Sequence, residues 1–435
     1  MARRTISPEP PLASGVGLPW DVPVPDAVAA IAAARAEHGD TFEVESGRDR
    51  YLFTFSPTGV RSFYALPEEA ASKGVADYLM LRRKLPDEVF ADRRTLPGTL
   101  FRRDDVASYL AHLDAALDAT AAEMGTGAGA EGRVDLFALS RRLGHRMGLA
   151  AWAGPGAADG ALFERLVAEM DALDGADSFV HPDRVRAVQE AGQAEERAAL
   201  ERVVDLLAPG VDAVHAAGAD DGELFGRMVA AWGEETPAVR RRGVALDVVL
   251  VHLASMSNLN AALGWVLVDL LDHPATLEAV RAGDTDLATR CCLESTRLAQ
   301  RSIMMRHVVE PVSLDTGATT YDVGAGVTIA TLLPLTNLSP ELGHDTWEPA
   351  RWQRHRFVDT EGLAAKELVT AFGHGRHTCP AQPFSLAAMT TALARLLGGY
   401  DLTPRWRQRP QPLAAQIGGV ARAATPAEVD YRARS

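Results

Sequence analysis

The residues best suited to chemistry lie in one stretch, Ala371-Phe372-Gly373-His374-Gly375-Arg376-His377-Thr378-Cys379-Pro380-Ala381. Two glycines two residues apart allow a tight turn that passes close to a flat partner. Cys379 lies just before an apolar run, 384–397, that predicts a helix, and the N-terminus of a helix stabilises a thiolate. His377 can hydrogen-bond an anionic group at the rim. The stretch predicts a loop that presents one sulfur to a cofactor; a buried free cysteine is the alternative.

The spacing Phe372-x-x-Gly375-x-His377-x-Cys379-x-Ala381 resembles the haem-binding loop of the cytochrome P-450 superfamily. That family usually has Phe-x-x-Gly-x-Arg-x-Cys-x-Gly, and some bacterial members carry His at the Arg position. The resemblance implies haem b as the cofactor, with Cys379 as the proximal iron ligand. Thiolate ligation pushes electron density to the iron.

Two further elements precede this loop in the order that the family has. Glu294 and Arg297, three residues apart, lie on one face of a predicted helix. Pro349-Ala350-Arg351-Trp352 follows some fifty residues later. The resemblance implies a buried structural cluster of Glu294, Arg297 and Arg351, and a buried carboxylate does need paired donors.

Arginines are the expected partners of the haem propionates. Arg306 stands nine residues beyond Arg297, where the family has a strand arginine, and a guanidinium fork suits a carboxylate. Phe90-x-x-x-Arg94 would be the family's aromatic-x-x-x-Arg pair. Arg93 is an equal candidate, Arg102 and Arg103 are not excluded, and a surface basic patch is an alternative.

A long apolar stretch, 243–271, predicts a helix that crosses the core. Its middle carries the polar insertion Ala254-Ser255-Met256-Ser257-Asn258, whose side chains either bond back to the preceding turn or face a cavity. The family's Ala-Gly-x-(Asp/Glu)-Thr falls here, so Ser257 replaces the acid and Asn258 the alcohol. We expect both to act on the distal side. The pocket residues that the resemblance implies, with core packing as the alternative, are Ala254, Ser255, Ile303, Met304 and Ile417.

Two reaction classes follow. In an ordinary oxygenase of the family, fed by ferredoxin and ferredoxin reductase, the acid and alcohol relay protons through water during dioxygen cleavage. An amide does not readily do this, but Asn258 can hold a substrate oxygen or nitrogen by hydrogen bond. The second class cleaves a weak N–O or O–O bond already present in the substrate and then rearranges it or transfers a nitrene-like or oxo fragment. Because both relay positions changed together, we favour the second class. A haem protein that binds a ligand without turnover is a third possibility.

The composition indicates the fold class and excludes some classes of partner and cellular setting. The 435 residues are 47% hydrophobic and 6% aromatic, and the alanine- and leucine-rich stretches favour a mainly helical chain. A net charge of −14 without a basic stripe argues against nucleic-acid binding. Three cysteines, two of them adjacent, form no disulfide framework, and no signal peptide or membrane-length apolar run is evident. We expect a cytoplasmic monomer. The alanine- and arginine-rich composition is typical of a high-GC bacterium, and a role in secondary metabolism is a hypothesis by association with such organisms.

The predicted architecture is one mainly α (α+β) domain over 1–435, with a long central helix over the haem and small β-sheets at one side. Residues 1–25 form an extended lead-in. The strands 41–45 and 50–55 make a hairpin, and 125–130 is a linker. Further helices are predicted over 27–37, from about 58, and over 104–124, 135–151, 161–174 and 184–208.

Overall fold

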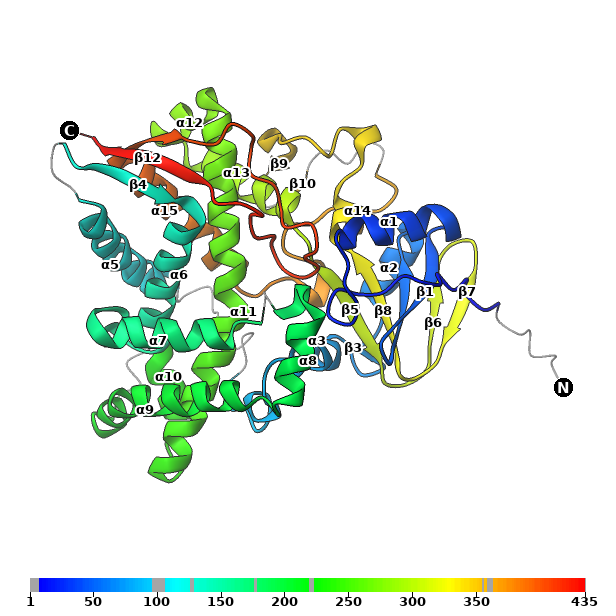
Figure 1. The fold of residues 1–435 in the computed structure, drawn as a ribbon, viewed down its shortest axis with the longest axis horizontal. Helices are drawn as coiled ribbons and strands as arrows, with labels where there is room; N and C mark the ends of the chain where they lie inside the picture. The colour runs from blue at the N-terminus through cyan, green and yellow to red at the C-terminus, as the bar shows by residue number, and fades with distance from the viewer. Residues whose placement is uncertain are drawn as a thin grey trace.

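The computed structural model describes residues 8–95, 106–125, 129–175, 178–218, 223–353, 356–357 and 363–434. Within these ranges the chain is mainly helical with small separate sheets (Figure 1), which confirms the predicted fold class. The helices are α1 (Ala27–His38), α2 (Pro57–Ala65), α3 (Lys73–Leu81), α5 (Val106–Met124), α6 (Leu136–Trp152), α7 (Gly160–Leu173), α8 (Pro182–Glu190), α9 (Ala194–Ala216), α10 (Leu224–Ala231), α11 (Pro237–Asp272), α12 (Pro274–Arg281), α13 (Thr285–Ala299), α14 (Leu333–Asn337) and α15 (Gln382–Gly399). The strands are β1 (Thr41–Ser46), β2 (Asp49–Thr54), β3 (Ala71–Ser72), β4 (Glu131–Asp135), β5 (Ile303–Val308), β6 (Val312–Asp315), β7 (Thr320–Val323), β8 (Val327–Leu332), β9 (Trp352–Gln353), β10 (Arg356–Phe357), β11 (Tyr400–Pro404) and β12 (Glu428–Ala433).

Helix α11 is the element on which the other helices pack. It begins with a proline in its first turn, where no backbone donor is needed, and ends at Asp272, followed by His273 and Pro274. It contacts α6, α9 and α13 and runs through the helical part of the molecule (Figure 1). By length and hydropathy α11 passes as a membrane span, contrary to the expectation from sequence, but 67% of its apolar window is buried inside the protein. That burial is the property of a core helix.

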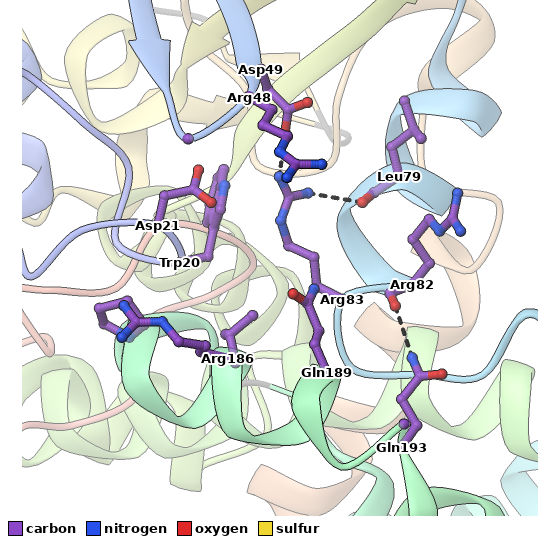
Figure 2. Close-up of a pocket in the computed structure, with 14 residues that line it drawn as sticks. Trp20, Asp21, Arg48, Asp49, Leu79, Arg82, Arg83, Arg186, Gln189 and Gln193 are labelled. Atoms are coloured by element: carbon purple, nitrogen blue, oxygen red, sulfur yellow. Dashed lines mark hydrogen bonds and ion pairs between the residues drawn. The ribbon is translucent and has the colours of Figure 1, made fainter.

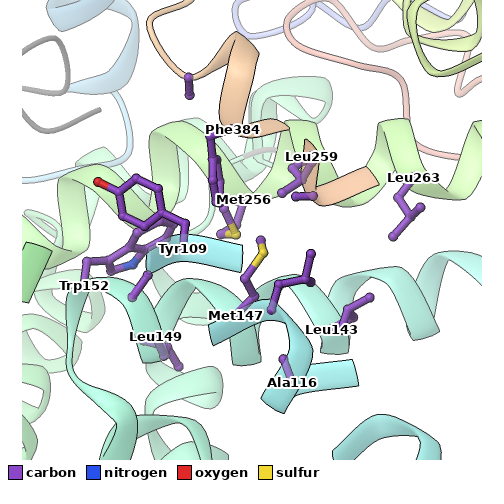
Figure 3. Packing of buried hydrophobic residues seen from close by; sticks show 14 of the residues in the cluster. Tyr109, Ala116, Leu143, Met147, Leu149, Trp152, Met256, Leu259, Leu263 and Phe384 are labelled. Carbon is purple, nitrogen blue, oxygen red and sulfur yellow. The ribbon is translucent and has the colours of Figure 1, made fainter. Parts of the chain in front are cut away.

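The core around the middle of α11 joins three helices. Met256 and Leu259 of α11 meet Met147 of α6 and Phe384 of α15 (Figure 3), and all four belong to the largest buried apolar cluster. Phe384 also lies edge-on to Tyr109 of α5, with the ring centroids 5.1 Å apart. These contacts fix α15, and therefore the loop that precedes it, against the central helix.

The largest sheet lies beside α1 and α2 (Figure 1) and has the strand order β1-β2-β8-β5-β3. The predicted hairpin is confirmed as β1 and β2, which pair antiparallel from Thr41↔Thr54 to Ser46↔Asp49. β2 pairs in parallel with β8, and β8 pairs antiparallel with β5. The sheet therefore holds β5, which carries Arg306, between two neighbours.

One helix that the sequence predicts as continuous is two separate helices in the structure. The stretch 184–208 is divided between α8 and α9, and the break lies at Gly192 and Gln193 with φ of 62° and 57°. Both residues adopt the left-handed region, which glycine enters at no steric cost and which ends a helix. The predicted linker 125–130 lies partly outside the described residues.

Buried imidazoles join α6 to α11. Trp152 Nε1 donates to His252 Nδ1 at 3.2 Å, so the other ring nitrogen of neutral His252 carries the proton and donates to His145 Nδ1 at 2.8 Å. Burial, with a smaller contribution from His145, lowers the pKa of His252 well below its ordinary value. His252 therefore stays neutral in the folded protein at pH values where an exposed histidine is charged.

We expect this histidine to make the protein acid-sensitive. Below the ordinary histidine pKa of about 6.5, His252 is protonated in the unfolded state but stays neutral in the folded state. The free energy of unfolding therefore falls by at most about 1.4 kcal/mol per pH unit as the pH drops. Above that pH the term vanishes. Urea unfolding between pH 8 and pH 5 should show a shallower decline in a His252→Gln variant. His215→Gln, at an exposed position on α9, is the matched control, and equal slopes in all three proteins would contradict the assignment.

Candidate active site

The loop around Cys379 is a tight turn that needs glycine. Gly373 and Gly375 have φ of 82° and 60°, and a Cβ on Gly373 would lie 2.6 Å from the His377 carbonyl oxygen. The Cys379 N–H donates to the Phe372 carbonyl at 2.8 Å and closes the turn. Helix α15 then begins at Gln382. The predicted arrangement of turn, cysteine and helix is therefore present.

The Cys379 thiol is mostly shielded from solvent. Burial raises its pKa, and the backbone N–H groups of Ala381 and Gln382, together with the Lys73 charge, oppose this rise. The two N–H groups belong to the start of α15, where they have no partner within the helix. The sulfur therefore sits where a thiolate receives hydrogen bonds, as a metal ligand requires.

Arg306 and His377 are brought together beside this loop. Arg306 is 1% exposed, and its guanidinium donates to the Ala71 carbonyl at 2.8 Å and to His377 Nε2 at 2.9 Å. Because arginine only donates, His377 Nε2 accepts and Nδ1 carries the proton. Burial, followed by the Arg306 charge, lowers the pKa of His377. Glu68 completes the cluster, 3.4 Å from Arg306 Nη2.

A cavity of about 580 Å³ opens on the Cys379 sulfur, between α11, β5, the cysteine loop and the segment 418–420. Its lining is largely apolar. The predicted residues that line it are Ala254, Ser255, Asn258, Ile303, Met304, Phe372, His377, Cys379 and Ala381. The structure thus collects most of the predicted pocket and cofactor residues around one space.

The Asn258 amide has a fixed orientation. Its Oδ1 accepts from the Val420 N–H at 2.9 Å, so its NH₂ group remains as the donor of this cavity-lining side chain. Gly419 makes this possible, because a Cβ there would lie 2.4 Å from Asn258 Oδ1. Asn258 therefore presents donors, not a proton-relaying hydroxyl, to whatever fills the cavity.

Arg306, a predicted cofactor ligand, does not line the cavity and reaches it only through His377. Three further predicted residues lie elsewhere. Ser257 is on the other side of α11, lines separate cavities there and has only a 3.5 Å contact with the Leu253 carbonyl, because neighbouring helix residues point about 100° apart. Ile417 is buried in an apolar cluster with β5, and its neighbours at 418–420 line the cavity instead. Gly375 shapes the turn without lining the space.

Arg94 is not brought to this cavity either. It forms an ion pair with Glu235 and stacks over the Trp232 ring, 5.0 Å from its centroid. Arg93, the alternative, pairs with Asp247 at 3.2 Å. Both arginines thus have partners near the start of α11. Arg102 and Arg103 lie outside the described residues.

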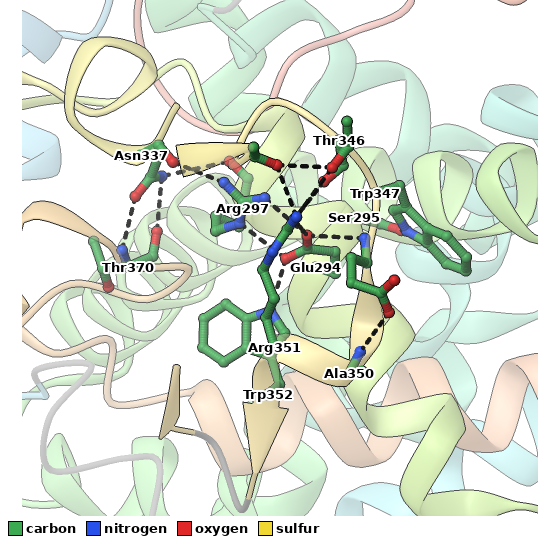
Figure 4. A network of polar contacts seen from close by, with 12 residues as sticks. Glu294, Ser295, Arg297, Asn337, Thr346, Trp347, Ala350, Arg351, Trp352 and Thr370 are labelled. Carbon is green, nitrogen blue, oxygen red and sulfur yellow. Dashed lines mark hydrogen bonds and ion pairs between the residues drawn. The ribbon is translucent and has the colours of Figure 1, made fainter. Parts of the chain in front are cut away.

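The structural cluster forms around Glu294, which is fully buried (Figure 4). Arg297 donates to both carboxylate oxygens at 2.8 Å, Arg351 donates to Oε1 at 3.1 Å and Trp352 Nε1 donates to Oε2 at 2.8 Å. The Glu348 N–H adds a fifth bond at 3.1 Å. The buried charge therefore has donors on both oxygens, as its burial requires.

Sequence reasoning missed how this cluster reaches the cysteine loop. Arg297 donates to the Asn337 carbonyl at 2.7 Å, and the Asn337 side chain exchanges two hydrogen bonds with the Thr370 backbone at 2.7 and 2.9 Å (Figure 4). Thr370 precedes Phe372 by two residues. Nothing in the local sequence marks Asn337, since its partners are 33 and 40 residues away.

Lys73 and Asp77 were also missed. They form an ion pair on α3, and both line the cavity near His377. A Lys and an Asp four residues apart are typical of an exposed helix face, so spacing alone gave no signal. Asp77 is the only carboxylate among the described residues that line this cavity.

A larger polar groove, of about 750 Å³, lies between the N-terminal segment, the β1–β2 hairpin, α3 and α8 (Figure 2). Arg83 is at its centre, paired with Asp49 and bonded to the Leu79 carbonyl at 2.8 Å. None of the predicted site residues lines it. The larger space is therefore not the candidate active site.

Comparison with known proteins supports the resemblance of the cysteine loop. No family model matches the chain. Cytochrome P450 7B1 of Mus musculus is 27% identical over 184 residues, 34% of this chain and 36% of that protein. Sterol 14-demethylase of Arabidopsis thaliana is 30% identical over 139 residues, 31% of this chain and 27% of that protein. Cytochrome P450 monooxygenase ataF of Aspergillus terreus is 28% identical over 200 residues, 39% of this chain and 40% of that protein.

These matches support a relationship of the chain to the cytochrome P-450 superfamily. The matched stretches span between about a quarter and two fifths of the length of those relatives. Haem is the cofactor that membership of this superfamily implies.

The residues around the cavity fit a haem. One thiol faces a largely apolar space beside a glycine turn that lets the backbone approach a flat molecule. His377 lines this space and is a donor for a carboxylate at one side, while Arg306 lies behind it, bonded to its Nε2 and outside the cavity lining. Among the described residues no group of three or more His, Cys, Asp or Glu side chains is placed to hold a metal ion.

Proposed function

We propose that this chain is a haem-thiolate enzyme that holds haem b on Cys379 and acts on a small hydrophobic substrate. The largely apolar cavity over the cysteine supports this proposal, as do the cytochrome P-450 relatives. When bound, the haem supplies an electron-rich iron centre for oxidative or bond-cleaving chemistry. His377, with Arg306 bonded behind it, would bind a carboxylate of the haem, and Met304 and Ile303 would exclude water from the reacting face.

We further propose that the substrate already carries a weak N–O or O–O bond, which the enzyme cleaves with rearrangement or group transfer. The observation that carries this is Asn258, a cavity-lining amide at the position of the family's proton-relaying alcohol, whose Oδ1 is held by the Val420 N–H so that its NH₂ group remains as a donor. Ser257, at the position of the family's acid, lines a different cavity. None of the described α11 residues that line the cavity over Cys379 is a carboxylate. Asn258 would bind an oxygen or nitrogen of the substrate and orient the bond. Rearrangement is redox-neutral overall, because the atoms of the broken bond are re-bonded within one molecule. In a transfer, the oxygen or nitrogen fragment bonds to the acceptor and the rest of the substrate leaves as an alcohol or a carboxylic acid, so no external electrons are needed.

Turnover without external electrons tests this proposal. The purified protein would be incubated with an organic hydroperoxide or an O-acyl hydroxylamine, with no reductase and no NAD(P)H. Consumption of the probe with formation of a rearranged or transferred product is the expected result. Product formation only when ferredoxin, ferredoxin reductase, NAD(P)H and dioxygen are all present would overturn it.

The second candidate is an ordinary monooxygenase that hydroxylates or epoxidises a natural-product intermediate. Its support is that relatives such as the Aspergillus terreus protein are named monooxygenases.

For this second candidate, Arg376, exposed beside the cysteine loop, would face an acidic ferredoxin. A slower reduction rate in Arg376→Glu would support this, and an unchanged rate would dismiss the docking role. For either candidate we propose a cytoplasmic monomer with a role in secondary metabolism.

Replacing Asn258 by Asp separates substrate binding from proton relay. Aspartate keeps an acceptor for the Val420 N–H but removes the two donors of this cavity-lining side chain. We expect kcat/KM without reductase to fall about ten- to hundredfold, the equivalent of one or two lost hydrogen bonds. Thr390→Val, which removes a hydroxyl bonded only within α15, is the control. Unchanged kinetics in Asn258→Asp would exclude Asn258 from substrate binding.

A further inference from the structure

Lys73 and Asp77 are the two charged residues of α3 that line the cavity over Cys379. They form an ion pair within this one helix. The charge of Lys73 is close enough to His377 and to the Cys379 thiol to act on both electrostatically. A cationic group therefore lies at the side of the cavity that His377 lines.

Lys73 occupies a position that helix stability does not favour. It is the first residue of α3, directly after the capping residue Ser72, and the first turn contains no acidic residue. The N-terminus of a helix carries a partial positive charge, which repels a lysine there. An ion pair in which the lysine precedes its acidic partner by four residues is also the weaker of the two possible orders. Local helix chemistry therefore does not account for Lys73, and it makes Asp77 a weak partner.

The start of α3 is tied to the cysteine loop through Arg306. The Arg306 guanidinium donates to the Ala71 carbonyl at 2.8 Å and to His377 Nε2 at 2.9 Å. Ala71 precedes Lys73 by two residues, as His377 precedes Cys379. The backbone that carries Lys73 is therefore held beside the loop, although Arg306 itself does not line the cavity.

A haem b brings two carboxylates to a largely apolar space, where an anion without a cationic partner is unfavourable. His377 has one ring N–H to donate and no permanent charge, because its Nε2 accepts from Arg306. Among the described residues that line the cavity, Lys73 and Arg376 are the permanent cations. Arg376 is exposed, so solvent screens its ion pairs. The Lys73 side chain is only 33% exposed and is the better-shielded cation.

We propose that Lys73 binds a carboxylate of the haem, and that it exchanges Asp77 for this partner when the cofactor binds. This inference rests on the proposed function, since it takes haem b as the cofactor. A charge-assisted hydrogen bond from an ammonium to a carboxylate is among the strong ones. Lys73 would thus take the role that sequence spacing predicts for Arg94, which Glu235 and Trp232 hold elsewhere.

Haem b and its dimethyl ester test this proposal, because both have the same iron and ring but the ester has no carboxylate charge. Each would be titrated into the full-length protein prepared without pigment, with tryptophan fluorescence and the absorption of the bound pigment as readouts. In Lys73→Met, affinity for haem b should fall about tenfold, while affinity for the ester stays that of wild type. Lys73→Arg keeps the charge and should restore the difference. Lys366→Met, at an exposed lysine outside the lining, should bind both pigments as wild type.

Asp77→Asn gives a result that misfolding cannot imitate. It removes the competing carboxylate and keeps the size of the side chain, so haem b should bind about threefold more tightly, with no change for the ester. Unchanged or weaker haem b binding in Asp77→Asn would overturn the proposal, as would an equal ratio of the two affinities in wild type and Lys73→Met. A ratio that changes in Arg376→Met instead would move the carboxylate to Arg376. If neither pigment binds the wild-type protein, the proposed function fails together with this inference.

Discussion

A Cys379→Ala variant should fold and yet lose its pigment. The side chain is half-buried at the base of a cavity, so removing one sulfur leaves the surrounding turn and α15 intact. It removes the only thiol that lines that cavity among the described residues. Absorption spectra of the purified protein, and of its ferrous carbonyl adduct, measure the result. We expect essentially complete loss of the long-wavelength carbonyl band that a thiolate complex gives.

Cys291→Ala is the matched control for this experiment. Cys291 is fully buried on α13, and burial raises the pKa of its thiol to about 12, so it stays protonated and inert. This variant should keep the pigment and the carbonyl band. A wild-type protein without colour, or a Cys379→Ala variant that retains the band, would remove the assignment of Cys379 and the function proposed from it.

The parts of the site that were predictable are those whose signal is local. The turn at Gly373 and Gly375, the cysteine and the following helix occur within one short stretch, and each follows from backbone sterics or helix-end chemistry. The hairpin β1–β2 is similarly local. The break between α8 and α9 was missed because helix-favouring residues on both sides outweighed the single Gly192.

The parts that were not predictable depend on helix phase or on distant partners. Packing of α11 against α6 and the 418–420 segment decides which of its faces carries Ser257 and which carries Asn258. Because polar residues occur on both faces, the sequence does not distinguish them. Arg94 has the spacing expected of a propionate ligand, but Glu235 and Trp232, more than a hundred residues away, hold it elsewhere. The residues next to Arg94 in the sequence give no indication of its contacts with Glu235 and Trp232.

The structural cluster gives the last prediction, because it links the fold to the cysteine loop. Arg297→Leu removes two hydrogen bonds from the Glu294 carboxylate, which is 0% exposed, and one from the Asn337 carbonyl. A buried carboxylate that loses its main partner costs about 3–5 kcal/mol of folding free energy. Because Asn337 holds Thr370, the cysteine loop should also loosen. Urea unfolding followed by circular dichroism should show a lower midpoint, and the pigment should dissociate faster into apomyoglobin.

Arg202→Leu separates the loss of this cluster from the loss of any arginine. Arg202 pairs with Glu169 between α9 and α7 through two bonds of 2.7 Å, so its geometry resembles that of Arg297 with Glu294, but the pair is at the surface. Solvent screens such a pair, so its unfolding midpoint should match wild type. Equal midpoints in Arg297→Leu and Arg202→Leu would show that the Glu294 cluster does not stabilise the fold. A lowered midpoint with unchanged pigment release would mean that Asn337 does not transmit the loss to the cysteine loop.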